Sequence, residues 1–183
     1  MSTSRTTDPR RLDVAAFVDA GGELAGEWTQ AELSRLVAGT VPGDTVPAGV
    51  RWRVRGAREA LEGAGMQPAL RLDAGTEVVL ECQRCLQPMS VPLQVERRLF
   101  LVAGEDTAET LDADSDDDVL ALTPSVDLRA LVEDELLLAL PLVPRHDACT
   151  LPLPAGVSDS PEEAEAAHPF AALAALRGKA LPN

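Results

Sequence analysis

Three cysteines and one histidine carry the clearest chemistry in this chain. Cys82 and Cys85 are separated by two residues, and His146 and Cys149 repeat that spacing far downstream. Zinc takes four thiolate or imidazole ligands in a tetrahedron, and a two-residue gap lets one tight turn present two of them. The four side chains are therefore candidate ligands of a zinc ion. With all four bound, no position remains for a catalytic water, so the ion would be structural.

The same cysteines have other interpretations. Small cysteines also occur as ordinary buried residues without a metal. A redox dithiol is a third interpretation, but redox motifs gain reactivity at a helix N-terminus, whereas Cys82 follows a predicted strand into a turn. Zinc and unligated thiols both stay open.

Arginines form a second candidate site. Arg51, Arg53 and Arg55 alternate with apolar residues, so they share one face of a predicted strand. Because guanidinium groups grip phosphates bidentately, we expect a local RNA-binding patch if the neighbouring strands pair side by side. The alternative is an exposed strand face balanced by nearby glutamates. The other arginines of the expected patch are Arg84, Arg97 and Arg98.

A third candidate site is an apolar segment near the C-terminus. Phe170, Leu173 and Leu176 are spaced as one face of a short helix within residues 169–178. This segment follows a stretch, 152–168, that is expected to be a flexible acidic tail. An isolated apolar turn docks either on its own domain or on a partner, so these three residues are candidate partner-docking residues.

Composition restricts the function. The net charge of −14 disfavours nucleic-acid binding by the chain as a whole, and an aromatic content of 3% disfavours a base-stacking surface. Residues 101–169 hold 17 acidic and 2 basic side chains, whereas residues 1–100 are nearly balanced. A contact with RNA would therefore be local. No phosphate loop, dinucleotide fingerprint or Gly-x-Ser-x-Gly motif is present, so we expect no enzyme, no small-molecule substrate and no DNA partner.

The hydrophobic pattern predicts an α+β fold. Strands are expected over 50–58, 69–73, 76–82, 89–102 and 119–123, forming an antiparallel β-meander of about four to six strands. The second and third would be separated by a turn at 73–75. Three- and four-residue apolar steps predict a long helix near 127–140, with the acidic Glu133 and Asp134 on its solvated side.

Besides the short C-terminal helix within 169–178, two shorter helices are expected in the N-terminal part of the chain. One covers 12–20, and a second covers 30–38 behind a capping box of Thr29 and Glu32. The domain plan is a flexible N-terminus over 1–11, then a single α+β domain over 12–151 with an acidic loop at 104–118. The N-terminus lacks the apolar run of a secretory signal, and no membrane span is expected. The cytoplasm is the expected location.

Three stretches stand out together: Leu-Glu-Cys-Gln-Arg-Cys at 80–85, the helix and loop at 131–147, and Pro-Phe-Ala-Ala-Leu-Ala-Ala-Leu at 169–176. In their order and spacing they resemble the YceD family of large ribosomal RNA subunit accumulation proteins. The resemblance implies a non-catalytic ribosome biogenesis factor that supports synthesis or accumulation of large-subunit (23S) rRNA. Its expected partners are precursor rRNA or pre-large-subunit ribosomal proteins. The alternative is a small structural-zinc or thiol protein that acts as a protein-interaction adaptor.

Overall fold

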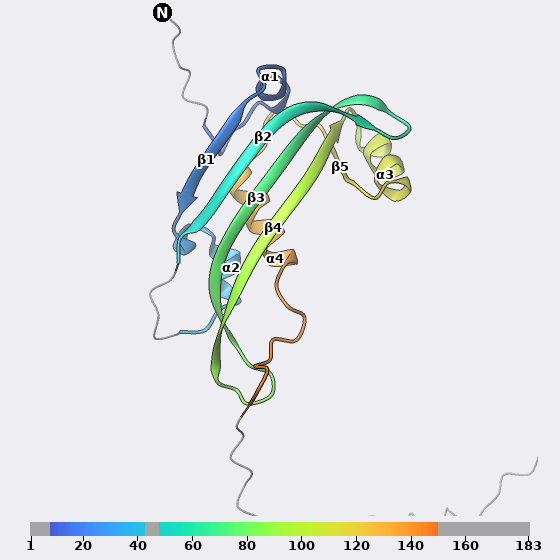
Figure 1. Cartoon of the computed structure of the whole chain (residues 1–183). Helices are drawn as coiled ribbons and strands as arrows, with labels where there is room; N and C mark the ends of the chain where they lie inside the picture. Colours follow the sequence, from blue (N-terminus) through green and yellow to red (C-terminus); the bar gives the residue numbers. More distant parts are fainter. Residues whose placement is uncertain (1–7, 43–47, 150–183) are drawn as a thin grey trace, which may run out of the picture. The chain divides into compact units, whose positions relative to one another are not determined.

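The computed structural model describes residues 8–42 and 48–149, which form a five-stranded sheet with helices (Figure 1). The strand order is β1-β2-β3-β4-β5; the first four strands are antiparallel, and β5 runs parallel to β4. The strands are β1 (Glu23–Trp28), β2 (Val50–Leu61), β3 (Gly65–Glu81), β4 (Pro88–Val102) and β5 (Asp118–Ala121). The helices are α1 (Val14–Asp19), α2 (Ser34–Ala38), α3 (Glu105–Asp114) and α4 (Leu128–Leu138), with a 3₁₀ turn at Gln30–Glu32.

The α+β class is confirmed, with two differences within the sheet. Strand β1 was not predicted, because Glu23–Trp28 contains an alanine and a glycine and shows no clean alternation of apolar and polar residues. Strand β5 is parallel to its neighbour, so the sheet is not purely a meander. A parallel pair requires a crossover between its strands, and here α3 supplies it.

The main core lies between one face of the sheet and the helices α1, α2 and α4. Alternation along β2 buries Val50, Trp52 and Val54 and exposes the arginines between them, as predicted. Helix α4 contributes Leu128 and Val132 at a four-residue step. Figure 1 shows α2 and α4 behind the long strands. The opposite face of the sheet is left mostly to polar side chains, except near α3.

Strand β3 is continuous through the segment that was expected to be a turn at 73–75. Ala74 pairs with Trp52 of β2 on one side and with Val95 of β4 on the other. A strand with partners on both edges has its backbone hydrogen bonds satisfied, which outweighs the turn preference of this tripeptide. Gly75 instead allows close packing, because a Cβ there would lie 2.5 Å from the Gln94 side-chain oxygen. The prediction of two strands at 69–73 and 76–82 was wrong.

Helix α4 confirms the long helix predicted near 127–140. Asp127 caps its N-terminus by accepting hydrogen bonds from the backbone N–H groups of Arg129 and Ala130. The prediction of a solvated Glu133 was wrong, because this side chain is only 7% exposed. It points at α2, whereas its neighbour Asp134 stays exposed.

Glu133 also explains why the helix predicted over 30–38 is split. Its carboxylate accepts hydrogen bonds from the backbone N–H groups of Arg35 (2.7 Å) and Leu36 (3.2 Å), and so caps α2 from another element. The backbone leaves helical geometry at the buried Leu33, between the 3₁₀ turn and α2. Ahead of that turn, the predicted link between Thr29 and Glu32 is present: the Thr29 N–H donates to the Glu32 carboxylate at 2.9 Å.

The acidic segment at 104–118 is not a loop throughout, because residues 105–114 form α3. Ala108 and Leu111 lie three residues apart and pack on a second small core that includes Phe100 and Val119. The Asp112 carboxylate accepts a hydrogen bond from the Val119 N–H at 2.8 Å. These contacts hold the helix against the end of the sheet despite its charge.

Part of the predicted flexible N-terminus is joined to the domain. Leu12, which directly follows the predicted 1–11 segment, is fully buried and exchanges two backbone hydrogen bonds of 2.9 Å with Val126. Pro9 accepts a third from Leu128 at 2.8 Å. The predicted acidic tail at 152–168 and the predicted helical segment at 169–178 lie outside the described residues. None of the described helices has the length and apolar character needed to cross a membrane.

Candidate metal centre and arginine face

The first half of the candidate metal centre is the loop between β3 and β4. Cys82 directly follows β3, and its N–H donates to the carbonyl of Gln87 at 3.0 Å. The Leu86 N–H donates back to the carbonyl of Cys82 at 2.8 Å. These two bonds close a tight turn that places Cys82 and Cys85 beside each other, as the two-residue spacing predicted.

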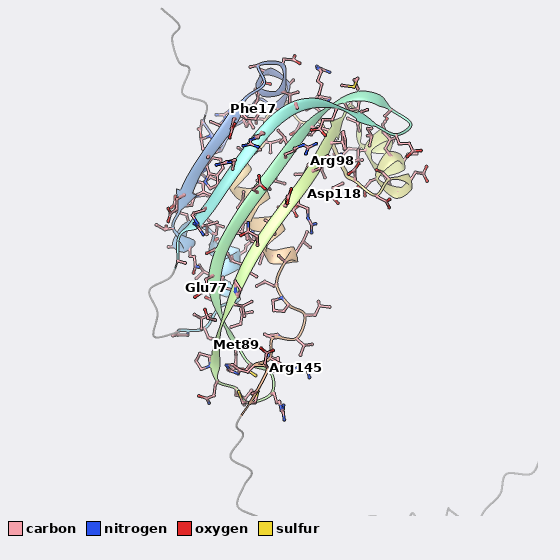
Figure 2. All side chains as sticks on the ribbon, viewed as in Figure 1. Phe17, Glu77, Met89, Arg98, Asp118 and Arg145 are labelled. Carbon is pink, nitrogen blue, oxygen red and sulfur yellow. The ribbon has the colours of Figure 1, made fainter. Side chains whose placement is uncertain are left out.

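The second half is the segment that follows α4. It returns to the β3–β4 loop, where the Gln83 N–H donates to the carbonyl of Pro144 at 2.9 Å. Figure 2 shows Arg145 of this segment and Met89 at the start of β4 at the same end of the sheet, far from Arg98. His146 and Cys149 thereby reach the two cysteines of the other loop.

The four ligand atoms lie within 4.8 Å of one another. The sulfurs of Cys82 and Cys149 are 3.6 Å apart, and the Cys85 sulfur lies 3.4 Å from Nδ1 of His146. A tetrahedral zinc with ordinary bond lengths would hold two sulfurs about 3.8 Å apart and a sulfur and a nitrogen about 3.6 Å apart. The donor set and its spacing therefore fit a closed tetrahedral metal site.

The electrostatics of the cluster also fit a cation. Burial would raise the pKa of the Cys82 thiol, but backbone N–H groups of His146, Arg84 and Cys85 lower it to about 5. Burial and the neighbouring Cys82 and Cys85 raise the pKa of the Cys149 thiol to about 11. The thiolate form of Cys82 is thus favoured, whereas the neighbouring sulfurs disfavour a second negative charge on Cys149. A bound divalent cation would remove that repulsion.

The predicted arginine patch is divided between different surfaces. Arg51, Arg53 and Arg55 point to the open face of the sheet, where β4 adds Arg98. Arg97 projects to the opposite face, and its guanidinium contacts the buried Glu135 of α4 at 2.9 Å. This contact makes Arg97 a structural residue of the domain.

Carboxylates occupy most of the open-face arginines. Glu23 lies 3.2 Å from Arg55 and 3.7 Å from Arg53. Arg98 makes a bidentate contact with Asp117 and lies over the ring of Phe100, 5.4 Å from its centre. Among the described residues, no ion pair within 4.0 Å includes Arg51. The open face is therefore a mixed-charge surface, and its least engaged guanidiniums belong to Arg51 and Arg53.

A hollow of about 620 Å³ lies between these two arginines. Its walls include Asp73 and Gln94, and small residues such as Ala25 leave the space above the strands open. The remaining predicted arginine, Arg84, lies elsewhere: with Arg145 and Val143 it lines a second hollow of about 430 Å³ beside the candidate metal centre. The structure thus groups four of the six arginines and separates the other two.

Two buried carboxylates were missed by sequence reasoning. Glu133 and Glu135 are each only 7% exposed and bind Arg35 and Arg97. Burial would raise the pKa of Glu133, but the N–H groups of α2 and the Arg35 guanidinium hold it below its usual value. Helical periodicity gives no signal for these pairs, because their partners lie on distant elements.

The fold and the ligand cluster define an α+β domain with a Cys₃His candidate metal centre. A family model described as large ribosomal RNA subunit accumulation protein YceD matches residues 70–177, which contain all four candidate ligands. That match spans more than half of the chain, so the chain belongs to the YceD family, as its motifs predicted.

The chain is also similar to the large ribosomal RNA subunit accumulation protein YceD of Haemophilus influenzae. The two are 40% identical over 107 residues, which cover 56% of this chain and 62% of that relative. No solved structure matched this chain. The predicted docking residues Phe170, Leu173 and Leu176 lie within the family match but outside the described residues.

Proposed function

We propose that this protein is a cytoplasmic, non-catalytic ribosome biogenesis factor that supports accumulation of large-subunit (23S) rRNA by binding precursor rRNA or a pre-large-subunit particle. The observation that carries the proposal is the family match over 70–177. This region includes β4, α4 and both halves of the candidate metal centre. The similar protein of Haemophilus influenzae is named for the same role.

We infer that the metal is zinc and that its role is structural. Three thiolates and one imidazole form a donor set that zinc prefers, and four protein ligands leave no open position for substrate. The ion would join the β3–β4 loop to the segment after α4, two parts of the chain that are otherwise tied by the Gln83–Pro144 hydrogen bond. Zinc would thus fix the shape of this end of the domain.

We further propose that a direct RNA contact uses the hollow between Arg51 and Arg53. These guanidiniums are exposed and only weakly engaged by carboxylates. The small residues at its floor give a phosphate close access to the strands. The acidic neighbours of this hollow limit its affinity, so contact with an assembled particle is favoured over capture of free RNA.

Gradient sedimentation tests the proposed function. A tagged full-length chain is expected in pre-large-subunit fractions of a sucrose gradient, and a deletion strain is expected to accumulate less large-subunit rRNA. The Arg51→Ala/Arg53→Ala double variant is expected to reduce the sedimenting fraction without changing the melting temperature. Absence of the wild-type chain from every such fraction, with normal rRNA levels in the deletion strain, would contradict the proposal.

A further inference from the structure

Exposed aliphatic side chains are frequent in the two segments that carry the candidate metal ligands and at the adjoining end of α4. In the described part of the chain, seven large apolar side chains are exposed, and four of them belong to the β3–β4 loop or to the end of α4 and the segment after it. Scattered apolar residues are normal on a protein surface, but a cluster indicates a contact surface. The four are Leu86 (64% exposed), Leu138 (74%), Leu142 (101%) and Val143 (57%).

Leu86 has a conformation that leucine disfavours. Its φ of 58° lies in the left-handed region, and it is the one non-glycine residue of the described chain with a positive φ. Glycine would adopt this geometry without strain, yet leucine occupies it and leaves its side chain exposed. Within the described fold, the exposed Leu86 side chain buries little apolar surface that could offset the strain of its backbone. The turn that presents Cys82 and Cys85 accounts for this backbone geometry, but it does not account for a leucine in place of glycine with its side chain in solvent.

The charges next to these side chains narrow the choice of partner. Arg84 and Arg145 line a hollow of about 430 Å³, together with Val143 and one acidic residue, Asp147. In a chain with a net charge of −14, this is a local basic site. A carboxylate entering the hollow would meet two guanidiniums, a geometry that favours charge-assisted hydrogen bonds.

Protein fits this surface better than RNA does. The residues from 82 to 88 and from 138 to 149 contain no Phe, Tyr or Trp, and the one aromatic ring among them, that of His146, belongs to a candidate metal ligand. Contact with a charged phosphate backbone buries little apolar surface of these four aliphatic side chains. Contact with apolar side chains of another protein removes that surface from water, which favours binding.

We propose that Leu86, Leu138, Leu142 and Val143, flanked by Arg84 and Arg145, form a docking surface for a protein segment with apolar side chains and neighbouring carboxylates. We name it the metal-loop surface. The proposal rests on the proposed function in one respect: the partner is expected to be a protein component of the pre-large-subunit particle. The two hollows then have separate roles, with RNA near Arg51 and protein at the metal-loop surface.

Photocrosslinking in cells tests the surface. Full-length chain carries benzoylphenylalanine in place of Leu142, and a matched control carries it in place of Met66, which is 58% exposed near the start of β3. We expect Leu142 to crosslink one protein through a peptide rich in apolar residues and Asp or Glu, with no such product from Met66. The proposal would be overturned by a product that nuclease removes, or by a product formed with a second copy of this chain or within the same chain. It would also be overturned by the same product from both positions, or by no product at all.

Two variants separate docking from folding. Leu86→Gly relieves the left-handed strain, so its melting temperature should stay the same or rise, and Leu142→Ser changes a fully exposed side chain. Both should lower the crosslinking yield from position 143 at least tenfold, whereas Met66→Ser should not. An unchanged yield in both variants would refute the surface. If the crosslink forms but the wild-type chain is absent from pre-large-subunit fractions, the docking surface stands and the proposed function fails.

Discussion

Removing the metal should open one end of the domain and leave the sheet intact. The segment 139–149 contains no helix or strand. Ala139 and Leu140 pack against the main core, and beyond them the segment is held by the Gln83–Pro144 hydrogen bond and by the metal cluster. A crosslink that closes a loop of about eleven residues stabilises it by about 3 kcal/mol in the chain-entropy model. The buried residues of the main core, such as Leu70 in the sheet and Val132 in α4, precede this segment in the chain.

Hydrogen exchange read by mass spectrometry measures this effect. Adding a chelator to zinc-loaded protein should raise the exchange rates of peptides over 82–88 and 139–149 by on the order of 100-fold, which corresponds to about 3 kcal/mol. A peptide from 93–102 in β4 should be unaffected, and Cys149→Ser should exchange like the chelated protein with or without zinc. Equal exchange of 139–149 with and without chelator would refute the reasoning, and so would loss of protection throughout the sheet.

Three other perturbations have expected outcomes. Glu133→Gln should lower the unfolding free energy by about 2–3 kcal/mol in urea melts, because N–H groups of α2 lose their carboxylate acceptor; the exposed Asp134→Asn should cost less than about 1 kcal/mol. Because the folded pKa of Glu133 lies below the unfolded value of about 4.3, its stabilisation is complete above that pH and is lost as the pH falls. Acid titration of stability should therefore be less steep in Glu133→Gln, and an identical slope would contradict this assignment. Gly56→Ala should lower the melting temperature by several degrees, because its Cβ would lie 2.8 Å from a ring carbon of Phe17. The control Gly39→Ala should change the melting temperature little, because its Cβ would have no neighbour closer than 3.6 Å.

Local patterns predicted the elements that position the candidate site. Alternation around Trp52 identified β2 and the side to which its arginines point, and the apolar steps after Asp127 identified α4. The two-residue spacing of Cys82 and Cys85 predicted a turn that the structure confirms. In each case the signal comes from residues a few positions apart, where backbone geometry alone relates their side chains.

Features that depend on distant partners could not be predicted. The continuity of β3 through Ala74 depends on strands on both sides, and the burial of Glu133 depends on α2, almost 100 residues away. The division of Arg97 from Arg98 follows from their alternation in β4, but the predicted patch counted both as neighbours. Which face of a strand is open is a property of the packed domain, so the sequence showed the arginines without showing their carboxylate partners.

The ratio of large-subunit to small-subunit rRNA in cells is the most direct measure of the proposed function. We expect the ratio to fall when the gene for this chain is deleted and to return to the wild-type value when the full-length chain is restored. An Arg51→Ala/Arg53→Ala chain that also carries Leu142→Ser should restore it poorly, although the protein folds. A ratio that is the same in wild-type and deletion strains would contradict the assignment to large-subunit rRNA accumulation.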